Sequence, residues 1–189
     1  MFEIEKNRIQ VEVMTKMDEV KACQAKENNS KGFLSKFLKP FAENQQPETG
    51  LKVLVCEDDK LQRLILKKSL EKRGIEAIFS ETPVRVLNQN YLKNFDFVIT
   101  DNRMPYMTGT QFTEYVEEEL NLELPMYMLS GDSYLKHELP ITKVRRGIFE
   151  KFEKLEKVLD EIFDDFKNYK KEIKQREESS INFNSTVSA

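Results

Sequence analysis

Short apolar runs alternate with amphipathic helical patterns along most of the chain after residue 50, and this alternation limits the fold more than any other feature. The apolar runs cover residues 51–56, 75–80, 95–100, 124–130 and 146–150. Parallel strands need crossover connections, and the connecting helices must bury an apolar stripe against the sheet. The sequence therefore predicts a doubly wound α/β domain with a five-stranded parallel sheet and an extended C-terminal helix.

Polar and helix-breaking residues divide the chain into parts. The stretch ENQQPETG, residues 43–50, contains a proline and a glycine and predicts a linker. We expect an N-terminal extension over residues 1–49, the α/β domain over 50–165, a helical extension over 166–178 and a tail over 179–189. The tail has few apolar residues, which predicts disorder.

Charge and composition exclude several classes of protein. The formal net charge of -3 gives no reason to expect nucleic-acid binding. No run has the apolar core of a secretory signal or the roughly 18 apolar residues of a membrane span, so we expect a cytoplasmic protein. Cys23 and Cys56 lie in different contexts, and the chain has one histidine, so neither a structural disulfide nor a zinc site is expected.

Polar residues follow four of the five predicted strands at their carboxyl ends, where ligands bind in open α/β sheets. In chain order they are Glu57 and Asp58, Asp101 in the stretch FVITDNRMP, Ser130, and Lys151. Taken singly, an acid can cap the next helix, as Asp59 can, and a serine can simply form a turn. Five such residues at successive strand ends instead predict one site.

Three clustered carboxylates repel one another unless a cation joins them. Hard oxygen ligands of this kind suit Mg²⁺, which commonly binds one or two carboxylates together with phosphate oxygens. A carboxylate is also a nucleophile that forms aspartyl-phosphates, and a lysine and a hydroxyl stabilise phosphoryl oxygens. The residues therefore predict a Mg²⁺-dependent site for a phosphoryl group.

The order of these motifs resembles the receiver domain of two-component response regulators. It combines an acidic pair after the first strand, D-x-x-M-P after the third, a serine followed by a small residue after the fourth, and a lysine after the fifth. The resemblance spans about residues 50 to 165, and Gly109 extends it after the third strand. It implies a flavodoxin-like receiver fold in a single-domain, chemotaxis-regulator-like protein.

The resemblance also implies a role for each site residue. Asp101 is expected to be the phosphoacceptor, with a histidine kinase or a phosphotransfer protein as the donor. Ser130 and Lys151 are expected to contact the phosphoryl oxygens. The implied Mg²⁺ ligands are Glu57, Asp58, Asp101 and the backbone carbonyl of Arg103. The signal is expected to pass to a downstream protein partner through a shift in conformational population.

The sequence departs from the family pattern at three places. Phe152 follows Lys151 where the family usually has proline, and Ile148 stands where it usually has an aromatic switch residue. Pro140 lies in the segment that replaces an ordinary fourth helix, which it should shorten or end. Separately, Arg103 and Asp132 are predicted to pair across the mouth of the site and to shield an acyl phosphate from water.

The two extensions carry apolar patterns of their own. The last helix has a heptad seam of Leu155, Leu159, Ile162, Phe166, Tyr169 and Ile173. We expect its first two turns to pack on the domain and its later turns to form a coiled-coil homodimer, with packing by the N-terminal segment or a free helix as alternatives. Residues 31–41 form a basic amphipathic pattern. They can pack on their own domain, dock in a partner's groove or, as a less favoured alternative, contact a membrane.

These features lead to one function and two rivals. The leading hypothesis is a response regulator that signals by phosphorylation-dependent contacts or relays phosphate, without enzymatic activity of its own. The first rival is a receiver-like adaptor that works without phosphorylation, suggested by Phe152 and Ile148. The second is a small hydrolase with an aspartyl-phosphate intermediate. It ranks last, because such enzymes usually have an aspartate where this chain has Arg103.

Overall fold

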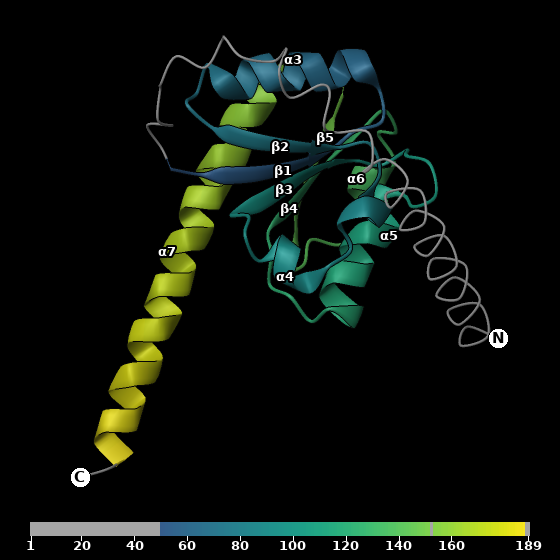
Figure 1. Ribbon diagram of the computed structural model, residues 1–189. Helices are drawn as coiled ribbons and strands as arrows, with labels where there is room; N and C mark the ends of the chain where they lie inside the picture. The colour runs from purple at the N-terminus through teal and green to yellow at the C-terminus, as the bar shows by residue number, and fades with distance from the viewer. Residues whose placement is uncertain (1–49, 152, 188–189) are drawn as a thin grey trace, which may run out of the picture.

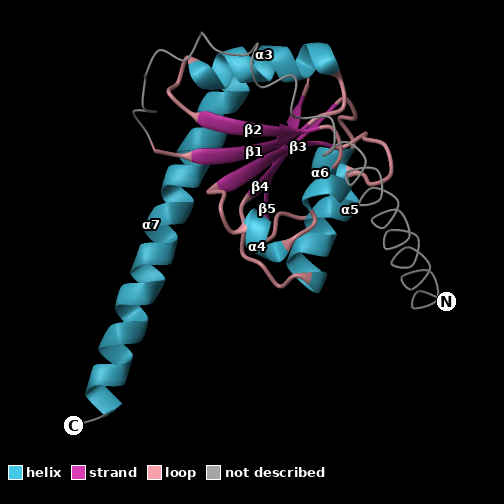
Figure 2. Ribbon diagram, viewed as in Figure 1, coloured by secondary structure: helices cyan, strands magenta, loops and turns pink. Residues whose placement is uncertain are grey.

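The protein has a parallel sheet covered by helices on both faces (Figure 1). The computed structural model describes the backbone of residues 50–151 and 153–187, and side chains as far as Ser179. All neighbouring strands are parallel, and their order across the sheet is β2-β1-β3-β4-β5 (Figure 2). The predicted doubly wound, five-stranded fold with a long last helix is confirmed.

The strands and helices follow the predicted order. The strands are β1 (Lys52–Cys56), β2 (Glu76–Ser80), β3 (Phe97–Asp101), β4 (Met126–Ser130) and β5 (Arg145–Glu150). The α-helices are α3 (Lys60–Glu71), α4 (Gln89–Leu92), α5 (Gly109–Glu114), α6 (Leu135–Glu138) and α7 (Leu155–Val187). A 3-10 turn, η1 (Pro83–Val86), precedes α4, and a π-helical turn, η2 (Tyr115–Glu119), continues α5.

Alternate residues of the central strands face two separate cores. In β1, Val53 and Val55 pack in the core that holds buried residues of α3 and α7. Leu54 and Cys56 belong to the other core, with α4, α5 and the turns beside them. Successive strand side chains point to opposite faces, so a nearly continuous apolar run supplies both cores at once.

Two of the expected crossover helices are short. The helical pattern PVRVLNQNYLKN, residues 83–94, lies between the second and third apolar runs and forms η1 and α4 rather than one helix. Leu87 leaves the helical region (φ -71°, ψ 53°), and the Asn88 side chain caps the start of α4 by accepting from the Tyr91 backbone N–H. The prediction that Pro140 shortens the fourth helix is confirmed: α6 has four residues and ends in an extended Leu139.

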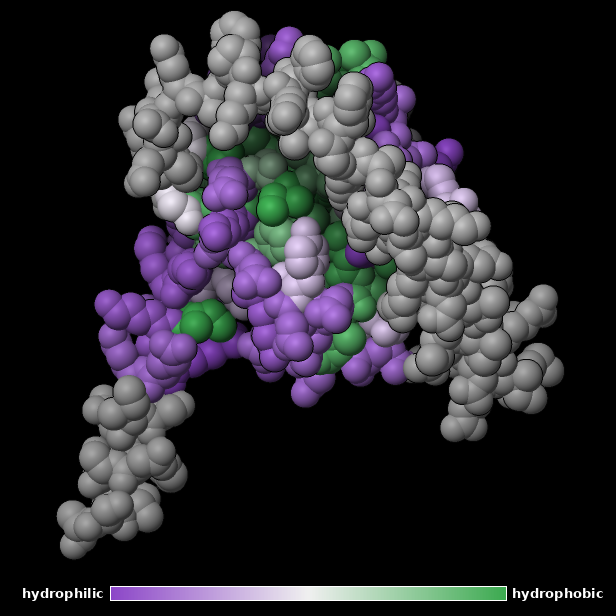
Figure 3. Space-filling view, viewed as in Figure 1, coloured by the Kyte–Doolittle hydropathy of each residue, from purple (hydrophilic) through white to green (hydrophobic). Residues whose placement is uncertain are grey.

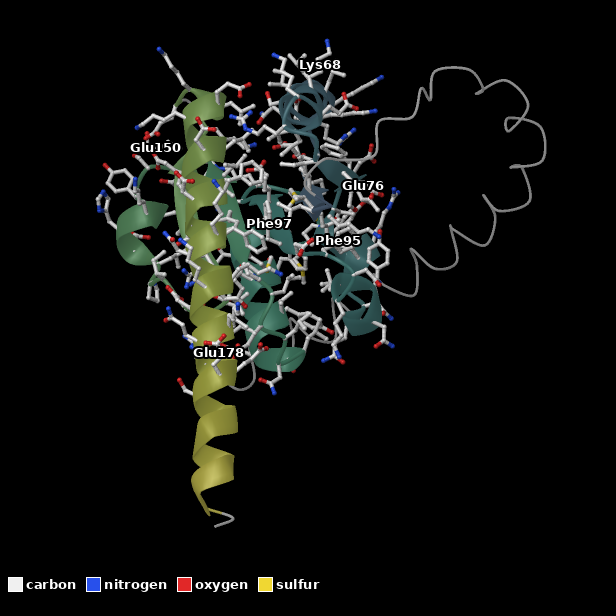
Figure 4. All side chains as sticks on the ribbon, turned by 90° about the vertical axis from the view of Figure 1, so that its left-hand side faces the viewer. Lys68, Glu76, Phe95, Phe97, Glu150 and Glu178 are labelled. Atoms are coloured by element: carbon white, nitrogen blue, oxygen red, sulfur yellow. The ribbon has the colours of Figure 1, made fainter. Side chains whose placement is uncertain are left out.

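The heptad seam of α7 is covered by the protein's own sheet. Leu159, Ile162, Phe166 and Tyr169 are buried in the core of the α3 side, and Leu155 and Ile173 pack against it. Phe97 of β3 contacts Phe166 with ring centroids 4.8 Å apart, and Figure 4 shows it beside α7. The seam thus gives no reason to expect a homodimer through these residues.

The length of α7 differs from the prediction for the tail. The helix continues to Val187, through most of the segment 179–189 that was expected to be disordered, and in Figure 1 it projects beyond the sheet. It contains no glycine or proline, and Ser179 donates to the Gln175 carbonyl at 2.7 Å. The small number of apolar residues predicted disorder. The helix nevertheless continues, because its earlier turns are already formed against the sheet and no glycine or proline follows to end it.

A partly buried polar cluster joins the middle of α7 to the sheet. Asp165 accepts a 2.8 Å hydrogen bond from the hydroxyl of Tyr127 in β4. It also accepts two 3.1 Å bonds from the guanidinium of Arg146 in β5, which lies over the Tyr169 ring. Burial, and then the bond to Asp165, raises the pKa of Tyr127. The cluster fixes the register of α7 on the sheet.

Replacing Asp165 with alanine should lower the free energy of unfolding by about 2 kcal/mol, because the buried Tyr127 hydroxyl and Arg146 lose their acceptor. Urea denaturation followed by circular dichroism measures this loss. Asp164→Ala is the matched control, since that neighbouring side chain is 73% exposed and its ion-pair partner among the described residues is Lys167. We expect the control to lose less than about 0.5 kcal/mol. Equal losses would contradict the role of the cluster.

Candidate functional site

Three carboxylates meet at the carboxyl edge of the sheet. Glu57 and Asp58 directly follow β1, and Asp101 is the last residue of the neighbouring strand β3. One carboxylate oxygen from each lies within 4.8 Å of the others. Glu57 and Asp101 are buried and Asp58 is exposed, so the cluster is open to solvent on one side. The sequence predicted a site at this edge of the sheet.

Lys151 bridges the two buried carboxylates. Its Nζ lies 2.9 Å from Glu57 Oε2 and 2.7 Å from Asp101 Oδ2. Lys151 follows β5, and its backbone N–H donates to the Ser130 carbonyl at 2.9 Å, which extends the pairing of β5 with β4 as far as the site. The ammonium group therefore offsets the repulsion between carboxylates that come from different strands.

Burial and charge act in opposite directions on these groups. Burial raises the pKa of Glu57 above its ordinary value, and the hydrogen bond from Lys151 opposes that rise. For Lys151 burial alone would lower the pKa, but hydrogen bonds to Asp101 and Glu57 outweigh it, and the pKa is raised. Lys151 therefore remains a cation at neutral pH, as its predicted contact with phosphoryl oxygens would require.

Ser130 ends β4 at the same edge. Asp101 pairs with Leu129 in the register of β3 and β4, so Ser130 extends one residue further toward the site. Its buried hydroxyl accepts a hydrogen bond from the Asp132 backbone N–H at 3.0 Å, which fixes the start of the next loop. The structure thus brings all five predicted strand-end residues to one edge.

The loop after Asp101 turns back tightly on the strand. The Arg103 backbone N–H donates to Asp101 Oδ1 at 3.2 Å, and the Gly109 N–H donates to the Asn102 carbonyl at 3.0 Å. A Cβ at position 109 would lie 2.3 Å from the Asp101 carbonyl oxygen, a distance that only glycine avoids. Asn102 also accepts from the Thr110 backbone and hydroxyl. These contacts fix the orientation of Asp101.

The predicted pair across the site mouth is present. Arg103 and Asp132 lie on adjacent loops with a nitrogen-to-oxygen distance of 3.9 Å. Their side chains are 74% and 36% exposed, so the pair is at the surface and weak.

The departures from the family pattern have different outcomes. Ile148 is buried in β5 opposite Met128, so an aliphatic core side chain occupies the place of the usual aromatic residue. Phe152 lies outside the described residues, as does the N-terminal extension over residues 1–49.

Arg63 is a site residue that sequence reasoning missed. It lies on α3, and one guanidinium nitrogen donates to the backbone carbonyls of Glu57 and Asp58, both at 2.7 Å. The other terminal nitrogen pairs with Glu81 at 2.9 Å. Asp59 acts as the predicted N-cap of α3, accepting from the Gln62 backbone N–H. An arginine early in the helix after an acidic pair was the available signal.

The donor set fits Mg²⁺. Carboxylate oxygens are hard ligands, and the exposed Asp58 keeps one side of the cluster open to solvent, which suits an ion that retains several waters. Arg103 lies at the site through its backbone bond to Asp101, and the role of its carbonyl as a ligand stays a prediction.

Residues 53–160 match the family described as the response regulator receiver domain. The chain belongs to this family. Curated relatives include the autoinducer 2 sensor kinase/phosphatase LuxQ of Vibrio vulnificus, 31% identical over 94 residues, which are 48% of this chain and 11% of that protein. The two-component response regulator ORR21 of Oryza sativa subsp. japonica is 35% identical over 86 residues, 44% of this chain and 12% of that protein. The chain thus spans about a tenth of the length of these relatives.

Solved receiver structures share the fold. The response regulator TrrA of Thermotoga maritima, crystallised in complex with Mg²⁺-BeF, superposes with a TM-score of 0.53 at 20% identity, covering 61% of this chain and 98% of TrrA. A response regulator receiver domain protein from Clostridium thermocellum gives 0.55 at 21% identity, covering 64% and 97%. Among the helices of the described part of this receiver, none is long and apolar enough to cross a membrane.

Replacing Arg63 with methionine should weaken Mg²⁺ binding by about tenfold, because the carbonyls of Glu57 and Asp58 lose the group that positions them. Isothermal titration calorimetry with MgCl₂ measures the dissociation constant. Arg73→Met is the matched control: Arg73 follows the same helix but binds Glu156 and Asp160 of α7. Both variants should lose stability, and only the first should lose affinity. Unchanged Mg²⁺ affinity in Arg63→Met would contradict the role of Arg63 in positioning the ligands.

Proposed function

We propose that this receiver accepts a phosphoryl group on Asp101 in a Mg²⁺-dependent reaction. The observation that carries the proposal is the arrangement around Asp101: a buried carboxylate 2.7 Å from the Lys151 ammonium, within 4.8 Å of the oxygens of Glu57 and Asp58. A carboxylate held in this way is available as a nucleophile, and a cation already lies where negative charge would develop.

The chain's own residues account for the chemistry of the transfer. A carboxylate oxygen of Asp101 attacks phosphorus in a phosphohistidine donor, the new O–P bond forms, and the P–N bond breaks with its electron pair passing to the imidazole nitrogen. Lys151 and the Ser130 hydroxyl contact the phosphoryl oxygens. Glu57 and Asp58, with Asp101 and the carbonyl of Arg103, would hold Mg²⁺. When bound, the ion neutralises negative charge on the transferring group.

The proposed partners follow from this chemistry. A histidine kinase or a phosphotransfer protein supplies the phosphoryl group, and the names of LuxQ and ORR21 associate related receivers with kinases and two-component regulation. We propose that the protein then signals to a downstream partner through phosphorylation-dependent contacts, or passes the phosphate on, and that it has no substrate of its own. An adaptor role without phosphorylation is the alternative, and the buried Ile148 at the switch position favours it.

Incubation with acetyl phosphate and Mg²⁺ should add the mass of one phosphoryl group to the intact protein. Asp101→Asn should abolish the gain, because an amide is not a comparable nucleophile, and removing Mg²⁺ with EDTA should do the same. Asp96→Asn is the control, since Asp96 precedes β3 and accepts from the Lys52 backbone away from the site. Intact-mass spectrometry provides the measurement. No gain with any donor would favour the adaptor, and donor turnover without accumulation would favour the hydrolase.

Replacing Arg103 with alanine should shorten the lifetime of the phosphorylated protein by up to about fivefold, the range expected for an exposed ion pair. The physical reason is that water gains access to the acyl phosphate when the pair with Asp132 is lost. Loss of the phosphoryl group is followed by mass spectrometry after the donor is removed. If the pair acts as a unit, Asp132→Ala should have a similar effect and the double variant no larger one. An unchanged lifetime in Arg103→Ala would exclude shielding by this pair.

A further inference from the structure

A pocket lies at the outer edge of the sheet, where β2 ends. Among the described strands β2 pairs with β1 alone, and the pocket is lined by residues of α3, β2, η1 and α4. Its volume is about 520 Å³, within the range of about 300–1,000 Å³ that is typical of small-molecule sites. Asp101, Ser130 and Lys151 do not line it, so it is distinct from the phosphoryl site.

Part of the pocket lining is apolar. Val86 is buried, Phe79 is partly buried and Tyr91 is 38% exposed, and these three residues are here called the apolar wall. The Tyr91 ring packs edge-on against Phe95 with ring centroids 5.2 Å apart, which holds it in place. In Figure 3, hydrophobic side chains reach the surface between β2 and α4. The apolar wall therefore offers a partly exposed surface to a ring or another flat apolar group.

Two guanidinium groups and one carboxylate also line the pocket. Arg63 pairs with Glu81 at 2.9 Å, and its other terminal nitrogen donates to two backbone carbonyls, so its charge is compensated. Arg85 is exposed, and within the described part of the chain it forms neither an ion pair nor a side-chain hydrogen bond. The pocket thus contains one positive charge without a counter-charge, next to the apolar wall.

These features together favour one class of ligand. The planar guanidinium of arginine binds a carboxylate through two parallel hydrogen bonds. Glu81 would repel a second negative charge, so a monoanion suits the pocket better than a phosphate ester does. We infer that the pocket binds an aromatic carboxylate, with the carboxylate on Arg85 and the ring on the apolar wall. The bound ligand would then lie beside Arg63, which holds the carbonyls of Glu57 and Asp58.

The flat aromatic monoanion 2-naphthoate is a direct probe of this pocket. We expect it to bind the full chain with a dissociation constant of about 1 mM or lower, the affinity usual for a ligand of this size. NMR of the isotope-labelled protein measures the binding, without Mg²⁺ so that no metal ion recruits the carboxylate. The backbone amide signals of Phe79, Ser80 and Arg85 should shift, whereas those of Ser130 and Lys151 should not.

Replacing Arg85 with methionine should weaken the binding of 2-naphthoate about tenfold, because the carboxylate loses its charged partner. Lys93→Met is the matched control, since Lys93 is an exposed cation that follows α4 and does not line the pocket. It should change the dissociation constant by less than about twofold, because a distant exposed charge is screened. An equal affinity in Arg85→Met and the unaltered protein would overturn the inference.

Two further probes separate the recognition of charge from contact with any apolar surface. The neutral analogue 2-naphthamide should bind about tenfold more weakly than 2-naphthoate, and Arg85→Met should not weaken it further. The dianion 2-naphthyl phosphate should also bind more weakly, and Glu81→Gln should strengthen its binding. Equal binding of 2-naphthamide and 2-naphthoate would contradict the proposed site. So would a lack of saturation at about ten times the expected dissociation constant. Neither Mg²⁺ nor a phosphodonor is needed, so a negative result leaves the proposed phosphorylation untouched.

Discussion

The ion pairs of Lys151 with two buried carboxylates are the constraint around which the site is organised. Glu57 follows β1 and Asp101 ends β3, while Lys151 comes from the far edge of the sheet, after β5. Two buried acids so close together would repel each other strongly without a cation between them. The arrangement therefore requires the carboxyl ends of β1, β3 and β5 to be in register. The ion pairs connect the residue after the last strand of the chain to the residue after the first strand.

Both helical layers contribute to this constraint. From one side of the sheet, Arg63 of α3 holds the backbone of Glu57 and Asp58. From the other side, the first residue of α5, Gly109, lies against the backbone of Asp101 at a distance that excludes any side chain. The site thus depends on helices that have no group in the proposed chemistry, and their positions follow from apolar packing on opposite faces of one sheet.

Much of the fold and most of the site could be predicted because both depend on local patterns and on one topological rule. Apolar runs with helical patterns between them imply parallel strands, and parallel strands bring Asp101, Ser130 and Lys151 to the same edge. The partner of an amphipathic helix is not encoded in its pattern. The seam of α7 suggested a second copy, but Phe166 and Tyr169 pack on the chain's own sheet. Arg63 was missed because its acceptors are backbone carbonyls, so only its position in the helix after the acidic pair could have indicated its role.

The sequence by itself determined the order of the elements, the residues at the strand ends and the chemistry they offer, because the periodicity of apolar residues and the type of side chain are local properties. The tertiary structure alone decided what covers each apolar surface and which charges meet. It placed α7 on the sheet through Asp165, Tyr127 and Arg146, and it left Leu61 and Leu64 of α3 exposed. The physical reason is that burial and charge compensation depend on distances between residues far apart in the chain, and only the folded sheet sets those distances.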